Sequence, residues 1–259
     1  MSTPSYNIGA VERETGLSKD LLRMWERRYG FPSPARSAAR GDAAPPPFEK
    51  DVLGLLHRHD HASLQHLLAQ LVMGQGLQKF VLESATPLNR AIGDAWMRGE
   101  LQVFEEHLYT EQLQVALRAA INAFPRAAAG TPRVLLTTFP GELHGLGLLM
   151  VEALLVPEGA QCVSLGTQTP VEDIHRAANA HRAAIVALSF SAAFPLRSAV
   201  EGLETLRGVL PQHVTIWAGG EMTRRMRKTM AGIVLVPDLA SAIPVLRSWR
   251  AHWVPPAAA

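Results

Sequence analysis

Five short apolar runs in the second half of the chain constrain its fold more than any other feature. They occupy residues 134–139, 160–166, 184–191, 214–220 and 232–236. Segments with the apolar spacing of helices separate the runs, and each run is too uniformly apolar for a strand with one face in water. Strands that alternate with helices predict a parallel, doubly wound α/β domain of flavodoxin-like or Rossmann-like type over residues 131–254.

Residues 48–126 follow a purely helical pattern. Apolar residues recur there at spacings of three and four, with breaks near residues 59–62, 73–76 and 98–99. The pattern predicts about four helices that pack as a small bundle.

The first 41 residues predict two short helices joined at a turn that contains Gly16, as in a helix-turn-helix. They carry seven Lys or Arg against four acidic residues, although the whole chain has a net charge of only +2. A small basic unit is expected of a nucleic-acid-binding module, and a solvated basic face is the alternative. The candidate DNA contacts are Lys19, Arg23, Arg27 and Arg28. Together the three parts predict a multidomain protein of α and α/β units.

The sequence lacks membrane-targeting segments and recognisable catalytic motifs, and both absences bear on where the protein is found and what it does. No apolar stretch is long enough to cross a bilayer, and the first residues lack a secretion signal, so we expect a cytoplasmic protein without a membrane partner. Neither a nucleophile triad nor a pair of carboxylates is recognisable, so we expect no enzymatic activity.

The loop after the first predicted strand carries a polar pair. His144 lies in this loop, and Glu142 precedes it by two residues. Ligands of doubly wound domains bind at the carboxyl ends of the strands. A carboxylate beside a metal-binding histidine orients the ring and raises its basicity. A surface histidine is the alternative, and it would be favoured for a lone residue.

His144 is part of a longer pattern of spaced residues, which argues against a lone surface histidine. The other members of the pattern are Gly147, Ser189, Ser191, Gly219 and Gly220. The first serine follows the first glycine after 41 residues, and the glycine pair follows the second serine after 27. Together with Glu142, the set resembles the cobalamin-binding signature of the methionine synthase and methylmalonyl-CoA mutase families, which have Leu at the position of the second serine.

This resemblance assigns a role to each member of the pattern. It implies that His144 binds cobalt in place of the nucleotide tail of the cofactor, and that the serine hydroxyls line the pocket of this tail. Paired glycines let the backbone approach the tail closely. A simple turn between strand and helix is the alternative for the glycine pair taken alone.

The predicted bundle contains a second pattern, in which Trp96 is followed after nine residues by Glu106 and His107. It resembles the helical cap of light-sensing, cobalamin-dependent regulators of the MerR type, the CarH/LitR photoreceptor family. The resemblance implies that the tryptophan covers the adenosyl group and that the Glu-His pair contacts it. A place in the bundle core is the alternative for Trp96. Met97 stands where the best-known relatives have a histidine that binds cobalt after photolysis, so a bis-His photoproduct through this position is excluded.

The N-terminal motif is similar to the DNA-reading start of the same regulators, so the resemblance covers nearly the whole chain. It departs at Arg40, where the chain runs into prolines instead of the family's wing, which predicts a truncated winged helix. The resemblance implies an adenosylcobalamin-dependent, light-responsive regulator that binds promoter DNA as a dimer or tetramer. The alternatives are a corrinoid carrier for methyl transfer, and a related sensor that binds haem or no cofactor and signals through protein partners.

Overall fold

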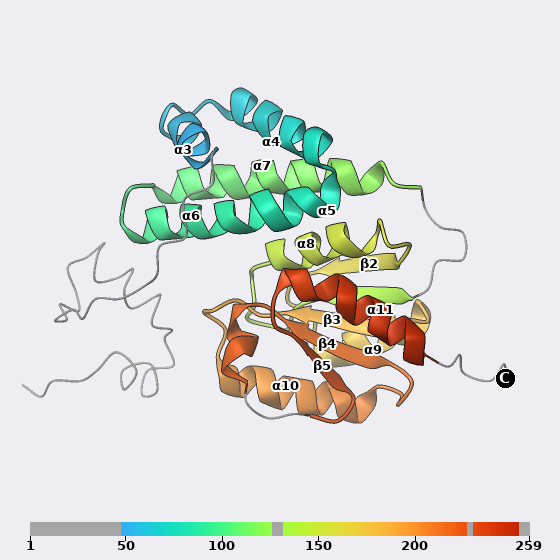
Figure 1. Ribbon diagram of the computed structural model, residues 1–259. Coiled ribbons are helices and arrows are strands. Elements are labelled where there is room, and N and C mark those ends of the chain that lie inside the picture. The colour runs from blue at the N-terminus through green and yellow to red at the C-terminus, as the bar shows by residue number, and fades with distance from the viewer. Residues whose placement is uncertain (1–47, 126–131, 227–229, 254–259) are drawn as a thin grey trace, which may run out of the picture. The chain divides into compact units, whose positions relative to one another are not determined.

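The structure is a computed structural model that describes residues 48–125, 132–226 and 230–253. The chain divides into two compact units, and the division falls at Ala116 and Leu117 (Figure 1). The four candidate DNA contacts, Lys19, Arg23, Arg27 and Arg28, lie outside the described residues. Within the described residues, no helix combines the length and the apolar character that a membrane span needs.

The first unit is helical. Its elements are α3 (Glu49–His57), α4 (His61–Gln75), α5 (Leu77–Lys79), the π-helical segment η1 (Phe80–Ala85), α6 (Thr86–Met97) and most of α7 (Val103–Asn122), whose last residues lie beyond the division. Because α5, η1 and α6 follow one another without a break, they form one long helix, and the four predicted helices are confirmed. The breaks fall where the backbone turns left-handed, at His59, Gly76 and Gly99. The helices enclose a core of fully buried apolar side chains such as Leu64, Leu88 and Leu113.

Pro87 explains why the long helix changes its hydrogen-bonding pattern at η1. A proline has no N–H, so it leaves a carbonyl of the preceding turn without its backbone donor. Just before the proline, the Thr86 backbone N–H donates to the carbonyl of Val81, five residues earlier, and the Thr86 hydroxyl donates to the same carbonyl at 2.7 Å. A wider turn of this kind accommodates the missing bond without ending the helix.

The second unit is a parallel five-stranded sheet with helices between its strands. The strands are β1 (Arg133–Thr137), β2 (Gln161–Gly166), β3 (Ile185–Ser189), β4 (Thr215–Gly219) and β5 (Ile233–Val236). The helices are α8 (Leu146–Leu155), α9 (Val171–Ala180), α10 (Leu196–Val209) and α11 (Ala242–His252), and two short 3-10 turns, η2 (Glu221–Arg225) and η3 (Leu239–Ser241), complete the unit. Every predicted strand is present, and the order β2-β1-β3-β4-β5 is that of a flavodoxin-like fold.

Helices cover both faces of this sheet. Residues of α9 and α10 pack with one face in the main core, for example Ile174 and Leu203 against Val186 and Ile216. On the other face α8 contacts β1, β2 and β3, and α11 packs beside α8 (Figure 1). The inner strands β1 and β3 are therefore almost fully buried, whereas the edge strand β2 is half-exposed. The uniform apolar runs of the inner strands follow from this double cover.

The strand order also fixes where a ligand can bind. The chain leaves β1 towards β2 on one side of the sheet and leaves β3 towards β4 on the other. The loops after β1 and β3 therefore diverge, and they open a crevice at the carboxyl ends of these two neighbouring strands. This is the place of both His144 and Ser191.

Candidate functional site

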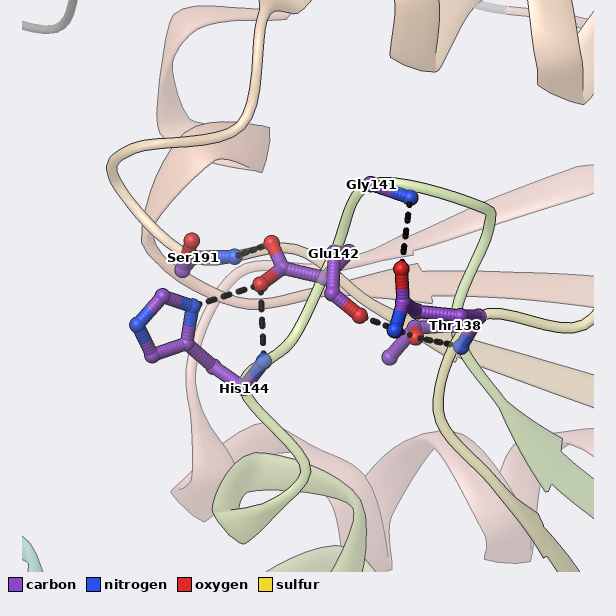
Figure 2. Close-up of polar contacts among 6 residues, drawn as sticks. Thr138, Gly141, Glu142, His144 and Ser191 are labelled. Atoms are coloured by element: carbon purple, nitrogen blue, oxygen red, sulfur yellow. Dashed lines mark hydrogen bonds and ion pairs between the residues drawn. The ribbon is translucent and has the colours of Figure 1, made fainter.

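Glu142 organises the loop after β1. Its side chain is only 1% exposed, whereas the His144 side chain is 66% exposed. One carboxylate oxygen, Oε1, accepts hydrogen bonds from the His144 ring Nδ1 at 2.6 Å and from the His144 backbone N–H at 3.0 Å (Figure 2). The carboxylate therefore fixes the ring and the backbone of the same residue.

The second oxygen of Glu142 joins the loop after β1 to the loop after β3. Oε2 accepts a hydrogen bond from the Ser191 backbone N–H at 2.7 Å (Figure 2). Burial opposes ionisation of this carboxyl, but the hydrogen bonds from His144 and Ser191 outweigh it, and the pKa of Glu142 lies below its usual value. The group is thus an anchored carboxylate at neutral pH.

An ionised carboxylate determines which proton His144 carries. Since the carboxylate can only accept, the ring donates from Nδ1, and in a neutral imidazole Nε2 then holds the lone pair. A neutral imidazole with its Nδ1–H on a carboxylate is the usual form of a metal-binding histidine.

Three phenylalanines of the loops after β1 and β3 pack together. The rings of Phe139 and Phe194 lie 5.6 and 5.4 Å from that of Phe190, and all three residues are almost fully buried. Phe139 also accepts the Glu142 backbone N–H through its carbonyl at 3.1 Å. A side chain at Gly202 on α10 would place its Cβ 2.6 Å from the Phe139 ring, so only glycine fits there. The loop therefore rests on a packed apolar floor.

The remaining members of the predicted pattern lie at the same edge of the sheet. Gly147 lies in the first turn of α8, and a Cβ there would come within 2.6 Å of the Ser189 hydroxyl oxygen. Gly219 ends β4, and Gly220 has a φ of 99°. A Cβ at Gly220 would lie 2.2 Å from the Phe190 carbonyl oxygen. Gly147 and Gly220 are thus required by close approaches within the protein itself.

The Ser191 hydroxyl differs from the other polar groups around Glu142, which form hydrogen bonds within the protein. It is buried beside the Glu142 carboxylate, yet it lacks hydrogen-bond geometry to any of the described residues. A buried polar atom without a partner costs free energy, about 1–3 kcal/mol for a neutral group. An ordered water or a bound ligand can supply such a bond.

Two residues of this site, Thr138 and Gln168, were not predicted from the sequence. The Thr138 hydroxyl donates to the Glu142 carbonyl at 2.8 Å and accepts the Gln168 backbone N–H at 2.8 Å. Gln168 lies in the loop after β2, far along the chain, and only the position of Thr138 at the end of a predicted strand could have indicated a role.

In the helical unit, the structure brings Glu106 and His107 together in the first turn of α7. The His107 ring Nδ1 lies 2.7 Å from Glu106 Oε2, and the Thr110 hydroxyl donates to Glu106 Oε1 at 2.9 Å. Trp96 lies near the end of α6, at the other side of the short connection to α7, and it is half-buried. The fully buried residues of this part of α6 are Ile92 and Ala95, so Trp96 lies at the margin of the core.

Comparison with protein families divides the chain into three matched regions. Residues 6–43 match the MerR HTH family of regulatory proteins. Residues 49–121 and residues 132–237 match two families that are both described as a B12 binding domain. The first match covers the basic N-terminal part, and the other two cover the helical and the α/β part.

Individual proteins match most of the chain. The chain is 26% identical to the HTH-type transcriptional repressor CarH of Myxococcus xanthus over 86% of its own length and 91% of the relative. It is 27% identical to the repressor CarA of the same organism, over 72% and 76% of the two chains. The monomethylamine corrinoid protein of Methanosarcina barkeri shares the fold, with a TM-score of 0.58 at 16% identity over 75% of this chain and 94% of that one.

A MerR region is followed in this chain by two B12-binding regions, and the matches to two transcriptional repressors extend over most of its length. Residues 6–43 exclude a B12-binding domain alone, and the crevice of the α/β unit has the polar groups that such a domain needs. The chain thus combines a MerR-type region with two B12-binding regions, the composition of a MerR-type regulator with a cobalamin-binding domain.

Proposed function

We propose that the chain is an adenosylcobalamin-dependent regulator in which His144 binds cobalt from the α/β unit. The observation that most strongly supports this proposal is the contact of the His144 ring with the buried Glu142 carboxylate at 2.6 Å. It holds the imidazole in the form that binds a metal and directs it from a crevice at the carboxyl ends of β1 and β3.

The nucleotide tail of the cofactor is proposed to bind beside β3 and β4. Ser189 and Ser191 supply hydroxyls there, and the Ser191 hydroxyl has no partner among the described residues. Gly219 ends the neighbouring strand and Gly220 follows it, and both half-buried residues leave this edge of the sheet without a side chain. These features fit an elongated polar group that enters the sheet from its carboxyl edge.

Trp96, Glu106 and His107 are proposed to contact the upper ligand of the cofactor. Trp96 has an aromatic face at the margin of the helical core, and the Glu106-His107 pair offers an exposed imidazole with an oriented ring. Adenosylcobalamin supplies a cobalt–carbon bond that light can break, so light and the supply of cofactor are the proposed signals. Met97 offers no imidazole for a second bond to cobalt.

The proposed output is promoter DNA binding by a dimer or tetramer through Lys19, Arg23, Arg27 and Arg28. One short recognition helix contacts few bases, so useful affinity requires at least two copies on two half-sites. The match of residues 6–43 to MerR regulators favours this output over methyl transfer by a corrinoid carrier, which has no use for a DNA-binding region. The function needs no catalytic residue.

The test combines a spectrum with a gel-shift series. The full chain is loaded with adenosylcobalamin in the dark, its absorption spectrum is recorded before and after illumination, and retardation of DNA from its own promoter region is measured alongside. We expect a spectrum with protein imidazole on cobalt and a retarded band that weakens steeply as salt rises. No retarded band in dark or light would exclude DNA as the output and leave a sensor that acts on protein partners.

A further inference from the structure

Thr138 connects the loop that carries His144 to a loop that the proposed site does not include. Its side chain is fully buried at the end of β1, and its hydroxyl donates to the Glu142 carbonyl at 2.8 Å (Figure 2). The same oxygen accepts the backbone N–H of Gln168 at 2.8 Å. The one donor of this hydroxyl is therefore used on the loop after β1, and an acceptor position is used on the loop after β2.

The loop after β2 is itself held in an unusual conformation. Gln168 has a φ of 63°, which is rare for a residue with a side chain and persists only where the surroundings fix it. The backbone N–H of Thr169 donates to the Thr138 carbonyl at 2.9 Å, and the Gly141 N–H donates to the Gln168 side-chain oxygen at a longer 3.4 Å. The two loops are thus joined at three places around Thr138.

The hydrogen bond from Thr138 affects the orientation of His144 through Glu142. It fixes the backbone of Glu142, and the carboxylate of the same residue orients the His144 ring. A shift of this backbone would move the carboxylate and the ring together. A bond from an imidazole nitrogen to a metal is directional, so its strength depends on where the ring is held.

We propose that Thr138 is a positioning residue for the cobalt ligand: its buried hydroxyl ties Glu142 to the loop after β2 and thereby strengthens the bond from His144 to cobalt. The inference rests on the proposed function, since it assumes that His144 binds cobalt. It adds the loop of residues 166–169 to the elements that control the lower side of the cofactor. Thr138 itself touches no reacting atom.

The experiment measures the pH at which His144 leaves cobalt. The full chain loaded with adenosylcobalamin is titrated with acid in the dark, and the absorption spectrum gives the midpoint between the forms with and without bound imidazole. A weaker bond is lost to protonation at a higher pH. For Thr138→Val, which keeps the shape and removes the hydroxyl, we expect the midpoint to rise by about 0.5–1 pH unit, a roughly three- to tenfold weaker bond.

Three further variants separate positioning from general stability. Thr138→Ser keeps the hydroxyl and should hold the midpoint within about 0.2 unit of the wild-type value, since its bonds remain possible. Thr205→Val removes a hydroxyl that donates to the Glu201 carbonyl at 2.8 Å within α10, and should leave the midpoint unchanged. Gln168→Gly keeps the backbone N–H, is compatible with a φ of 63°, and should also leave it unchanged.

An unchanged midpoint in Thr138→Val with cofactor bound overturns the inference. If that variant does not fold, Thr138→Ala gives the same test, because it also removes the hydroxyl. A rise in Gln168→Gly as large as that in Thr138→Val overturns it too, since the glutamine side chain would then be the link. If His144→Ala retains the imidazole spectrum, the proposed function fails first. If it loses that spectrum while Thr138→Val matches the wild type, only the role of Thr138 fails.

Discussion

The two compact units each contain a glutamate that orients a histidine, and the two pairs differ in how the glutamate is held. In the α/β unit, Glu142 is 1% exposed and accepts three hydrogen bonds from two loops. In the helical unit, Glu106 is 31% exposed and binds its neighbour His107 and Thr110, all within one helix. The contact of imidazole Nδ1 with carboxylate is nearly the same, at 2.6 and 2.7 Å.

The difference predicts different roles for the two histidines. A buried carboxylate with several fixed donors has no alternative position, so the ring that it orients keeps one direction. A pair in the first turn of a helix, open to water, is worth little and can exchange its partners with solvent. We therefore expect His144 to be the permanent ligand, and His107 to respond to what occupies the upper side of the cofactor.

The largest expected effect is the loss of His144. In His144→Ala we expect the imidazole spectrum to disappear and cobalamin affinity to fall by about 100-fold or more, since a direct ligand exceeds the 10- to 100-fold effect of the groups that orient it. The affinity is measured by titration with adenosylcobalamin in the dark. His213→Ala is the matched control, because His213 is an exposed loop histidine of the same unit. Equal affinities and spectra in the two variants would end the assignment of His144.

Glu142→Gln tests the buried pair directly. The amide keeps the size of the side chain but has one acceptor oxygen, whereas the carboxylate uses one oxygen for His144 and the other for Ser191. We therefore expect cobalamin affinity to fall by about 10- to 100-fold. The imidazole spectrum should persist in a weakened form, with a higher pH of detachment. An affinity within about threefold of wild type would show that the buried carboxylate serves the fold alone.

The same variant changes the pH dependence of stability. The pKa of Glu142 is lowered in the folded protein, so its carboxylate stabilises the fold above the pKa of the unfolded chain, about 4.3. This contribution is lost as the pH falls through the lower folded value. The thermal midpoint of the cofactor-free wild type should therefore decrease more steeply below about pH 4.3 than that of Glu142→Gln. Parallel curves for the two proteins would contradict the lowered pKa.

The contrast between the units also explains what could be predicted from the sequence. The five strands were predictable because inner parallel strands are covered on both faces and become uniformly apolar. The four helices were predictable from their spacing, since the residues that turn left-handed fall at the breaks. The contact of Glu142 with His144 is local, two residues apart, and could be inferred from their types.

Contacts between distant loops could not be predicted in this way. Thr138 meets Gln168 only because β1 and β2 lie side by side in register. Nothing in the residues around Gln168 marks a left-handed backbone, which is set by the neighbours in space. The π-helical segment was missed because the apolar spacing continues through it, and only Pro87 gives a local cause.

Trp96 provides a test of the proposed contact between the helical unit and the upper ligand. In Trp96→Ala we expect the preference for adenosylcobalamin over hydroxocobalamin to fall by about tenfold, because an aromatic face contributes about 1 kcal/mol or more through contact with a large upper ligand. The two dissociation constants are measured in the dark. Trp96→Phe keeps a ring and should retain most of the preference. A preference unchanged in both variants would assign Trp96 to the margin of the core alone.

The smallest effect is expected at Glu106, and it decides whether the two pairs really differ. Gln in place of Glu106 keeps one acceptor oxygen, whereas His107 and Thr110 bind different oxygens of the carboxylate. The Glu106 side chain is partly exposed, so water can replace the lost bond, and the cost is about 0.5 kcal/mol, or two- to threefold in affinity. Cobalamin titrations of Glu106→Gln and Glu142→Gln under the same conditions give the comparison. A fall in Glu106→Gln as large as that in Glu142→Gln would mean that the exposed pair is buried and fixed once the cofactor is bound. The helical histidine would then be as permanent a contact as His144, and the distinction drawn from exposure would apply only to the cofactor-free protein.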